Sequence, residues 1–222
     1  MTTKIVINMC LVELEKEYSR NLKSQYSELV KLYNKISLKQ ISLDKRDITY
    51  AILYRMKTYY EMQNDIKNFL NKRYISAASD FFVETIAFYL KLIIGIKKEN
   101  LEVHSERQIK PKRGFIRPDI SIWKDNQVIT IIECKTQLGW NRVKWEEDFY
   151  KREMKLKETY PKAKAYLLVM TAENWSGIPK DNKYFGRKYF TISKTRPSNI
   201  DFRDIDKAVI NPIEDLFLRV LS

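Results

Sequence analysis

The spacing of apolar positions along this chain changes after about residue 75. Before that point, charged and apolar residues are interleaved at helical spacing over residues 11–34, with no glycine or proline, which predicts a helix. A second helix is expected over residues 47–71, with Asp47 as its N-cap, after a loop over residues 37–45. Residues 1–75 are therefore predicted to form a helical N-terminal region.

The second part of the chain, residues 76–222, mixes helical and strand-like patterns. The predicted helices are residues 77–96, 141–160 and 212–221. The predicted strands are residues 101–109, 115–123, 127–135, 165–170 and 189–193. The continuous apolar run at 165–170 is typical of a strand buried on both faces, and residues 124–126 form a turn between two strands. This order predicts an α/β core, with a mixed sheet flanked by helices.

The balance of charged residues indicates a polyanionic partner. The chain has 41 Lys and Arg against 28 Asp and Glu, a net charge of +13. Basic side chains that contact phosphates release condensed counterions, which favours binding to nucleic acid. A basic surface that only keeps the protein soluble is the alternative.

Cysteine and histidine are too scarce for several classes of site. The chain has two cysteines, Cys10 and Cys134, and one histidine, His104. These numbers are too small for a disulfide framework, a Cys/His zinc cluster or a nuclease built on several histidines. The N-terminus is a poor secretory signal, and the most apolar run, residues 81–96, is interrupted by charges and too short to span a bilayer. We therefore expect a cytoplasmic protein with no membrane partner.

Two acids and a lysine occupy the ends of two predicted strands. Side chains alternate between faces along a strand, so Glu133 and Lys135 point the same way and Cys134 points oppositely. Counting outward from the turn places Asp119 beside the Glu133–Lys135 end of the partner strand. A surface salt bridge at a frayed strand end is the alternative to a functional site.

This arrangement has the chemistry of phosphodiester hydrolysis. Two adjacent carboxylates repel each other, and a divalent cation relieves the repulsion. Oxygen ligands that leave room for water and phosphate suit Mg²⁺, which stabilises charge on phosphoryl oxygens and helps to generate hydroxide. A neighbouring lysine can orient or deprotonate the attacking water and offset developing negative charge.

At these residues the sequence resembles the PD-(D/E)xK nuclease superfamily, which includes many type II restriction endonucleases. The resemblance consists of Pro118-Asp119 and of Glu133-Cys134-Lys135 in an apolar strand, between two helices, and it covers residues 77–170. It implies a restriction-endonuclease-like core in which Asp119, Glu133 and the main-chain carbonyl of Cys134 bind Mg²⁺, while Lys135 assists the water.

Two further residues are candidates for the same site. The family often carries an additional acid on the helix before the hairpin, and Glu84 occupies such a helix here. A lone carboxylate in so apolar a helix costs free energy unless it is partnered, and a pair with Lys91 or an arginine is the alternative. Gln137, one alternation beyond Lys135, is also expected to face the site.

Basic residues adjoin the motif on both sides in the sequence. We predict that they form a phosphate-binding rim that places a DNA backbone over the metal. A solvated loop is the alternative. The predicted DNA-binding residues are Lys110, Lys112, Arg113, Arg117, Arg142 and Lys144.

The sequence thus predicts a Mg²⁺-dependent endonuclease that acts on double-stranded DNA. The expected function is a type II restriction endonuclease that cuts a short sequence and works as a two-fold homodimer, because cutting both strands usually requires two active sites. The resemblance implies products with 5′-phosphate and 3′-hydroxyl ends. The alternatives are a structure-specific or repair nuclease similar to Holliday-junction resolvases, and a DNA-binding module whose nuclease-like core is inactive.

Overall fold

The computed structural model describes residues 11–39, 41–97, 99–138, 144–174 and 177–222. The chain divides into two compact units, Met1–Ile41 and Ser42–Ser222. The first unit contains helix α1 (Leu11–Ser37), none of whose described residues is buried. Ion pairs between residues three apart, such as Lys16 with Glu13, support this helix along its exposed surface.

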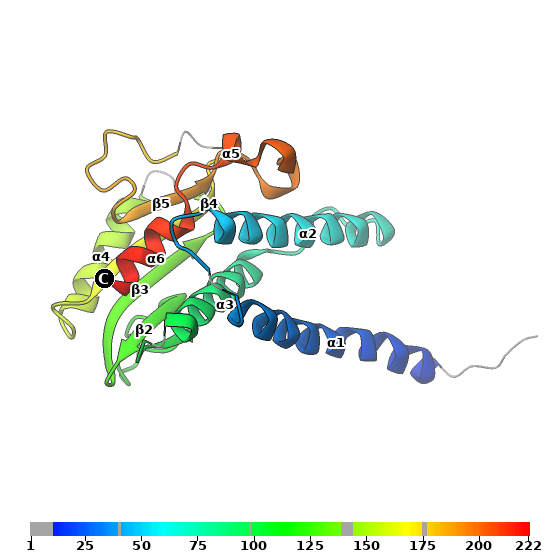
Figure 1. The fold of residues 1–222 in the computed structure, drawn as a ribbon, viewed down its shortest axis with the longest axis horizontal. Coiled ribbons are helices and arrows are strands. Elements are labelled where there is room, and N and C mark those ends of the chain that lie inside the picture. The colour runs from blue at the N-terminus through cyan, green and yellow to red at the C-terminus, as the bar shows by residue number, and fades with distance from the viewer. Residues whose placement is uncertain (1–10, 40, 98, 139–143, 175–176) are drawn as a thin grey trace, which may run out of the picture. The chain divides into compact units, whose positions relative to one another are not determined.

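The second unit is an α/β structure in which helices flank a five-stranded mixed sheet (Figure 1). Its helices are α2 (Asp47–Phe69), α3 (Ser79–Lys97), α4 (Trp145–Lys157), α5 (Ile205–Ala208) and α6 (Ile213–Leu221), with 3₁₀ turns η2 (Pro197–Asn199) and η3 (Phe202–Asp204). Its strands are β1 (Glu102–Ser105), β2 (Ile120–Lys124), β3 (Gln127–Lys135), β4 (Lys164–Thr171) and β5 (Tyr189–Ser193). The α/β class and the mixed sheet predicted from the sequence are confirmed.

The first two strands are shorter than the sequence pattern predicted. Strand β1 ends at Ser105, because Glu106 adopts a positive φ of 51° that breaks the extended backbone. Strand β2 begins only after Pro118, which has no N–H to donate to a neighbouring strand. Residues 115–118 therefore belong to the loop before β2.

The strands lie side by side in sequence order, β1-β2-β3-β4-β5. Strands β1, β2 and β3 are antiparallel neighbours, whereas β3, β4 and β5 are parallel. The β2–β3 turn contains Asp125 and Asn126, both with positive φ as a tight hairpin requires. The parallel step from β3 to β4 needs a crossover, which α4 provides.

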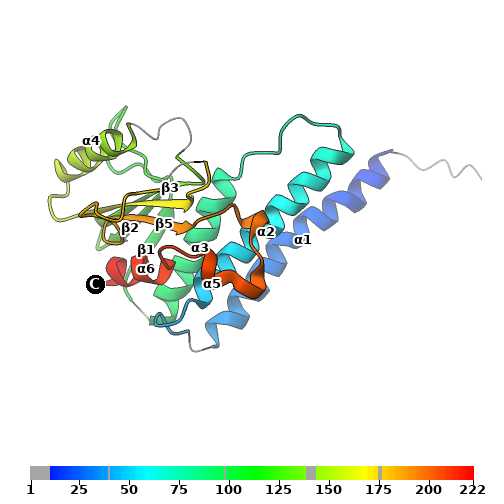
Figure 2. The same cartoon turned by 90° about the horizontal axis from the view of Figure 1, so that it is seen from above.

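Helices cover both faces of the sheet, with α4 on one face and α3 and α6 on the other (Figure 2). On the α4 face, Ile131 of β3 and Leu167 of β4 belong to a buried apolar cluster that includes Phe149 and Leu156 of α4. Because side chains alternate along a strand, Glu133 and Lys135 share the face of Ile131, whereas Cys134 points to the opposite face. Strand β4 is buried along both faces from Ala165 to Thr171, as its apolar run predicted.

Helix α2 is connected to α6 within the second unit, because a side chain of each helix caps the N-terminus of the other. The buried carboxylate of Glu214 accepts hydrogen bonds from the backbone N–H groups of Ile48 and Thr49, at 2.8 and 3.0 Å. In return, the Thr49 hydroxyl accepts a hydrogen bond of 2.8 Å from the backbone N–H of Ile213. These bonds satisfy donors that a helix start leaves unpaired. The compact units therefore divide at residues 41 and 42, whereas the hydrophobic pattern changes after residue 75.

No described helix is both long enough and apolar enough to cross a membrane.

Candidate active site

Asp119, Glu133 and Lys135, which we call the acidic site, lie at one end of the β2–β3 pair. Ile120 of β2 pairs with Ile132 of β3, so Asp119 immediately precedes the paired segment at the end where β3 finishes. The Asp119 carboxylate accepts a hydrogen bond of 2.7 Å from the backbone N–H of Cys134, and its Oδ2 lies 3.6 Å from Lys135 Nζ. The structure therefore brings Asp119 next to the acid-x-lysine segment, as the hairpin count predicted.

Glu133 is a buried carboxylate. Only 3 % of its surface is exposed, and it forms an ion pair with Arg152 of α4. Burial raises the pKa of Glu133, and the negative charge of Asp119 raises it further, while Arg152 and Lys135 act in the opposite direction. The two carboxylates are thus close enough to influence each other, and cationic side chains compensate their charge.

Arg152 is a site residue that the sequence analysis missed. It lies in α4 between Phe149 and Leu156, both of which are buried against the sheet. The sequence did contain a signal for this contact: Arg152 lies within about one helical turn of both Phe149 and Leu156, which belong to the apolar stripe of an amphipathic helix. Arg152 reaches Glu133 while 44 % of its own side chain stays exposed, so its guanidinium spans the boundary between the buried acid and solvent.

A cavity of about 440 Å³ opens beside Glu133, between the sheet and α4. Two acids, Glu133 and Asp148, and three basic residues, Lys135, Lys151 and Arg152, contribute charged groups to its lining. Apolar residues complete the wall, among them Leu138, Trp145, Phe149 and Leu167. The space beside the buried acid is therefore accessible from solvent and contains both acidic and basic groups.

Comparisons with known proteins give no family for this chain. No family model matches it, and no curated protein matches its sequence.

The donors at the acidic site fit a hard divalent cation. Among the residues that the structure describes, no group of three or more His, Cys, Asp or Glu side chains could hold a metal ion. The site instead offers two carboxylates, Asp119 and Glu133, and Mg²⁺ in proteins is commonly held by one or two carboxylates together with water and phosphate oxygens. A buried acid such as Glu133 also needs a positive partner, a role that Arg152 fills in this structure.

Cys134 contributes its backbone and not its thiol. Its side chain lies on the opposite face from Glu133, and burial raises the pKa of the thiol well above its ordinary value, which disfavours the thiolate. Its N–H donates to Asp119. Because an extended residue directs its N–H and C=O toward the same neighbouring strand, the carbonyl oxygen of Cys134 is directed to the side of Asp119.

Among the described residues, neither Glu84 nor Gln137 forms a hydrogen bond or ion pair with the acidic site. Glu84 is exposed on α3, so the apolar character of that helix imposes no burial cost on its charge. In the described parts of the chain, no hydrogen bond or ion pair joins Glu84 to Asp119 or Glu133. The charge of Glu84 instead acts on Tyr59 of α2, whose pKa is raised by burial and, to a smaller extent, by Asp80 and Glu84. Gln137 is exposed after the end of β3.

The predicted basic rim lies on two segments near α4. Lys110, Lys112, Arg113, Arg117 and Lys144 are exposed, while Arg142 lies outside the described residues. The loop that carries the first four is fixed to α4, because Lys155 Nζ donates a 2.7 Å hydrogen bond to the carbonyl of Gly114. Gly114 has a φ of +74°, a conformation that glycine adopts without strain. Lys144 is the N-cap residue of α4.

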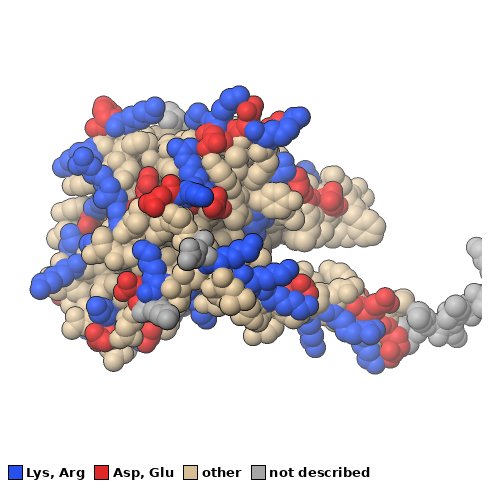
Figure 3. Space-filling model, viewed as in Figure 1, with Lys and Arg blue, Asp and Glu red and all other residues tan. Residues whose placement is uncertain are grey.

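Basic side chains are also common away from this rim. Over the face of the molecule drawn in Figure 3, Lys and Arg side chains are spread widely, with Asp and Glu side chains among them. Basic side chains are therefore not confined to the neighbourhood of the acidic site.

Proposed function

We propose that this protein is a Mg²⁺-dependent endonuclease with a restriction-endonuclease-like core, and that it cuts double-stranded DNA at a short specific sequence as a homodimer. The observation that supports this best is the convergence of Asp119, Glu133 and Lys135 at one end of β2 and β3. The net charge of +13 fits a polyanionic substrate.

Each residue of the site has a distinct role in this proposal. Asp119, Glu133 and the carbonyl of Cys134 would hold the cation. When bound, Mg²⁺ supplies charge stabilisation at the phosphoryl oxygens and a more acidic water. Lys135, with 48 % of its side chain exposed and its ammonium 3.6 Å from Asp119, orients the attacking water and offsets negative charge that develops on the phosphate.

Arg152 has two compatible roles. In the absence of a cation it neutralises Glu133. Its guanidinium carries several N–H donors in a planar fork, and its exposed portion can contact a phosphate oxygen of the bound strand. In this proposal Arg152 pairs with Glu133 before the substrate binds and contacts a phosphate oxygen once the strand is bound.

The ion pair between Arg152 and Glu133 also favours a second candidate function. In a DNA-binding module without nuclease activity, the guanidinium would replace the metal permanently, and the basic surface alone would account for DNA binding. The two candidates differ in whether DNA is cut when Mg²⁺ is present.

Digestion of unmethylated, phage-sized duplex DNA tests the proposal. The purified protein is incubated with Mg²⁺ or with EDTA, beside Asp119→Ala and a matched control, Asp65→Ala, which removes an exposed carboxylate from α2. Discrete fragments from the wild type and from the Asp65 variant, absent with EDTA and with Asp119→Ala, are expected. A smear would support a nuclease without sequence specificity, and intact DNA with retarded mobility would support the binding module.

A further inference from the structure

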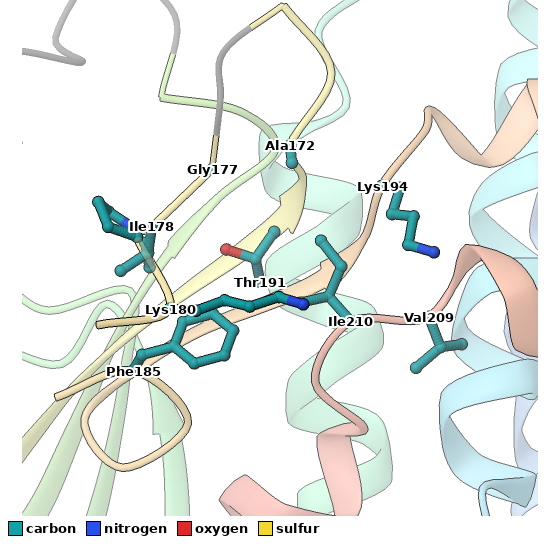
Figure 4. A pocket seen from close by; sticks show the side chains of 10 residues that line it. Ala172, Gly177, Ile178, Lys180, Phe185, Thr191, Lys194, Val209 and Ile210 are labelled. Carbon is teal, nitrogen blue, oxygen red and sulfur yellow. The ribbon is translucent and has the colours of Figure 1, made fainter. Parts of the chain in front are cut away.

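A second cavity, which we call the β5 cavity, lies on the α4 face of the sheet beside β5. It has a volume of about 730 Å³, within the roughly 300–1,000 Å³ typical of small-molecule pockets. Its walls come from the segment after β4, from β5 and from the segment before α6 (Figure 4). Among the described residues, none lines both this cavity and the cavity beside Glu133. The β5 cavity is therefore separate from the acidic site.

Thr191 places an unpaired polar atom in the lining of this cavity. Only 1 % of its surface is exposed, and within the described residues its hydroxyl oxygen has no hydrogen-bond partner. Its backbone N–H is satisfied, because it donates to the Asn211 side chain at 3.0 Å. A buried hydroxyl without a partner costs free energy, and a ligand that supplies a donor or acceptor would recover it.

The other lining groups define the shape and charge of a ligand. Ile178, Phe185 and Ile210 form apolar walls around Thr191 (Figure 4). Two lysines also line the cavity: Lys194 donates through Nζ to the carbonyl of Lys207 at 2.6 Å, and Lys180 is exposed. Figure 4 shows the Lys180 side chain among the groups that line the cavity. A fitting ligand combines a flat apolar body, a hydrogen-bonding edge and an anionic group.

We propose that the β5 cavity binds a nucleotide. The base packs against Phe185 and the aliphatic walls, and the buried Thr191 side chain rotates about χ1 so that its hydroxyl exchanges a hydrogen bond with an edge of the ring. The phosphate contacts the ammonium groups of Lys180 and Lys194. The nucleotide comes either from solution or from an unpaired position of a DNA strand, because both present the same base and phosphate. Binding here goes beyond the proposed cleavage reaction and requires neither Mg²⁺ nor Asp119.

Calorimetric titration of the full chain in EDTA tests this site without any cleavage. The probes are the four deoxynucleoside 5′-monophosphates, a short single-stranded oligonucleotide and the same oligonucleotide with one abasic position. Saturable binding of a monophosphate identifies a free nucleotide as the ligand. Binding of the oligonucleotide alone, weakened by the abasic position, identifies a nucleotide within a strand.

Two variants distinguish the loss of a proposed ligand contact from a change in protein stability or in net charge. Thr191→Val keeps the shape of the side chain and removes the unpaired hydroxyl, so we expect roughly three- to tenfold weaker binding with an unchanged or higher Tm. Lys180→Gln should weaken binding roughly two- to fivefold, whereas the matched Lys162→Gln, whose exposed lysine lines neither cavity, should not.

Absence of saturable binding for every probe, or equal affinity of Thr191→Val and the wild type, would overturn the nucleotide site. Because the titration contains EDTA and is repeated with Asp119→Ala, its result is independent of whether the protein cuts DNA. Failure of the cleavage assay and failure of this titration are therefore distinguishable.

Discussion

Glu133 illustrates at the residue scale how burial creates a requirement for positive charge. Removing a carboxylate from water costs several kcal/mol unless a partner compensates, and here Arg152 of α4 provides that partner. Asp119, Glu133 and Lys135 could be predicted from the sequence, because they are charged residues at the ends of otherwise apolar strands. Arg152 was not assigned to the site, because its contact with Glu133 depends on how α4 packs over the sheet.

Replacing Arg152 should destabilise the protein mainly when no divalent cation is present. Arg152→Met leaves Glu133 buried without its ion pair, and we expect the free energy of unfolding in EDTA to fall by about 1–3 kcal/mol, less than for a fully buried pair because Arg152 is partly exposed. Mg²⁺ should restore part of this loss, because a bound cation replaces the missing charge. Chemical denaturation in EDTA and in Mg²⁺ measures both effects.

The neighbouring Lys151→Gln is a matched control for the Arg152 variant. In the described part of the chain, the ion pair of Lys151 joins it to the exposed Glu147 of the same helix, so no measurable change in stability is expected in either buffer. Equal losses for Arg152→Met with and without Mg²⁺ would count against a cation site at Glu133.

At the scale of elements, the sequence predicted most of the sheet because strand patterns are local. The bounds of β3 and β5 agree with the predicted ranges, since each is a short apolar or alternating run that ends at polar residues. The order of the strands and the parallel pairing of β4 with β5 were not predicted, because they depend on contacts between segments far apart in the chain. The β5 cavity escaped prediction for the same reason: its lining joins three separate segments.

A second buried acid, Glu153, connects helix α4 to the segment that precedes β5. Its carboxylate forms ion pairs with Lys157 of α4 and with Lys188 just before β5. Burial alone would raise the pKa of Glu153, but the hydrogen bonds from Lys188 and Lys157 outweigh it and hold the pKa below its ordinary value of 4.5. The charged form is therefore favoured by folding. Its contribution to stability is present above pH 4.5 and is lost as the pH falls through the lowered folded-state pKa.

Glu153→Gln should therefore reduce the free energy of unfolding by about 1–3 kcal/mol near neutral pH, because it leaves two lysines without their shared acid. Denaturation curves of variant and wild type should converge once the pH is well below 4.5. Glu147→Gln, which alters only an exposed pair on the same helix, should behave as the wild type throughout. A stability difference for Glu153→Gln that is independent of pH would contradict this role of its charge.

At the scale of the whole molecule, the acidic site and the β5 cavity both belong to the unit Ser42–Ser222. The hydrophobic pattern grouped the first two helices together because both are amphipathic and rich in charge. In the structure, α2 belongs to the same unit as the sheet, and Thr49 and Glu214 each cap the N-terminus of the other's helix. A contact between residues so far apart in the chain cannot be predicted from the local sequence pattern.

The second unit should fold without the first. A chain that comprises residues 42–222 retains every described buried residue, so we expect cooperative thermal unfolding with a Tm within about 3 °C of the full chain. Circular dichroism and calorimetry measure this. A broad, non-cooperative transition in the truncated chain would show that the first unit contributes to the core.

The acidic site is tested most directly by the rate at which Lys135→Ala cuts duplex DNA in Mg²⁺ under single-turnover conditions, with DNA affinity measured in parallel. Lys124→Ala, which removes an exposed lysine from the far end of β2, is the matched control. We predict that Lys135→Ala binds DNA nearly as well as the wild type but cuts it at least about 100-fold more slowly, while Lys124→Ala cuts normally. Cleavage by Lys135→Ala at the wild-type rate would contradict a catalytic role for this site.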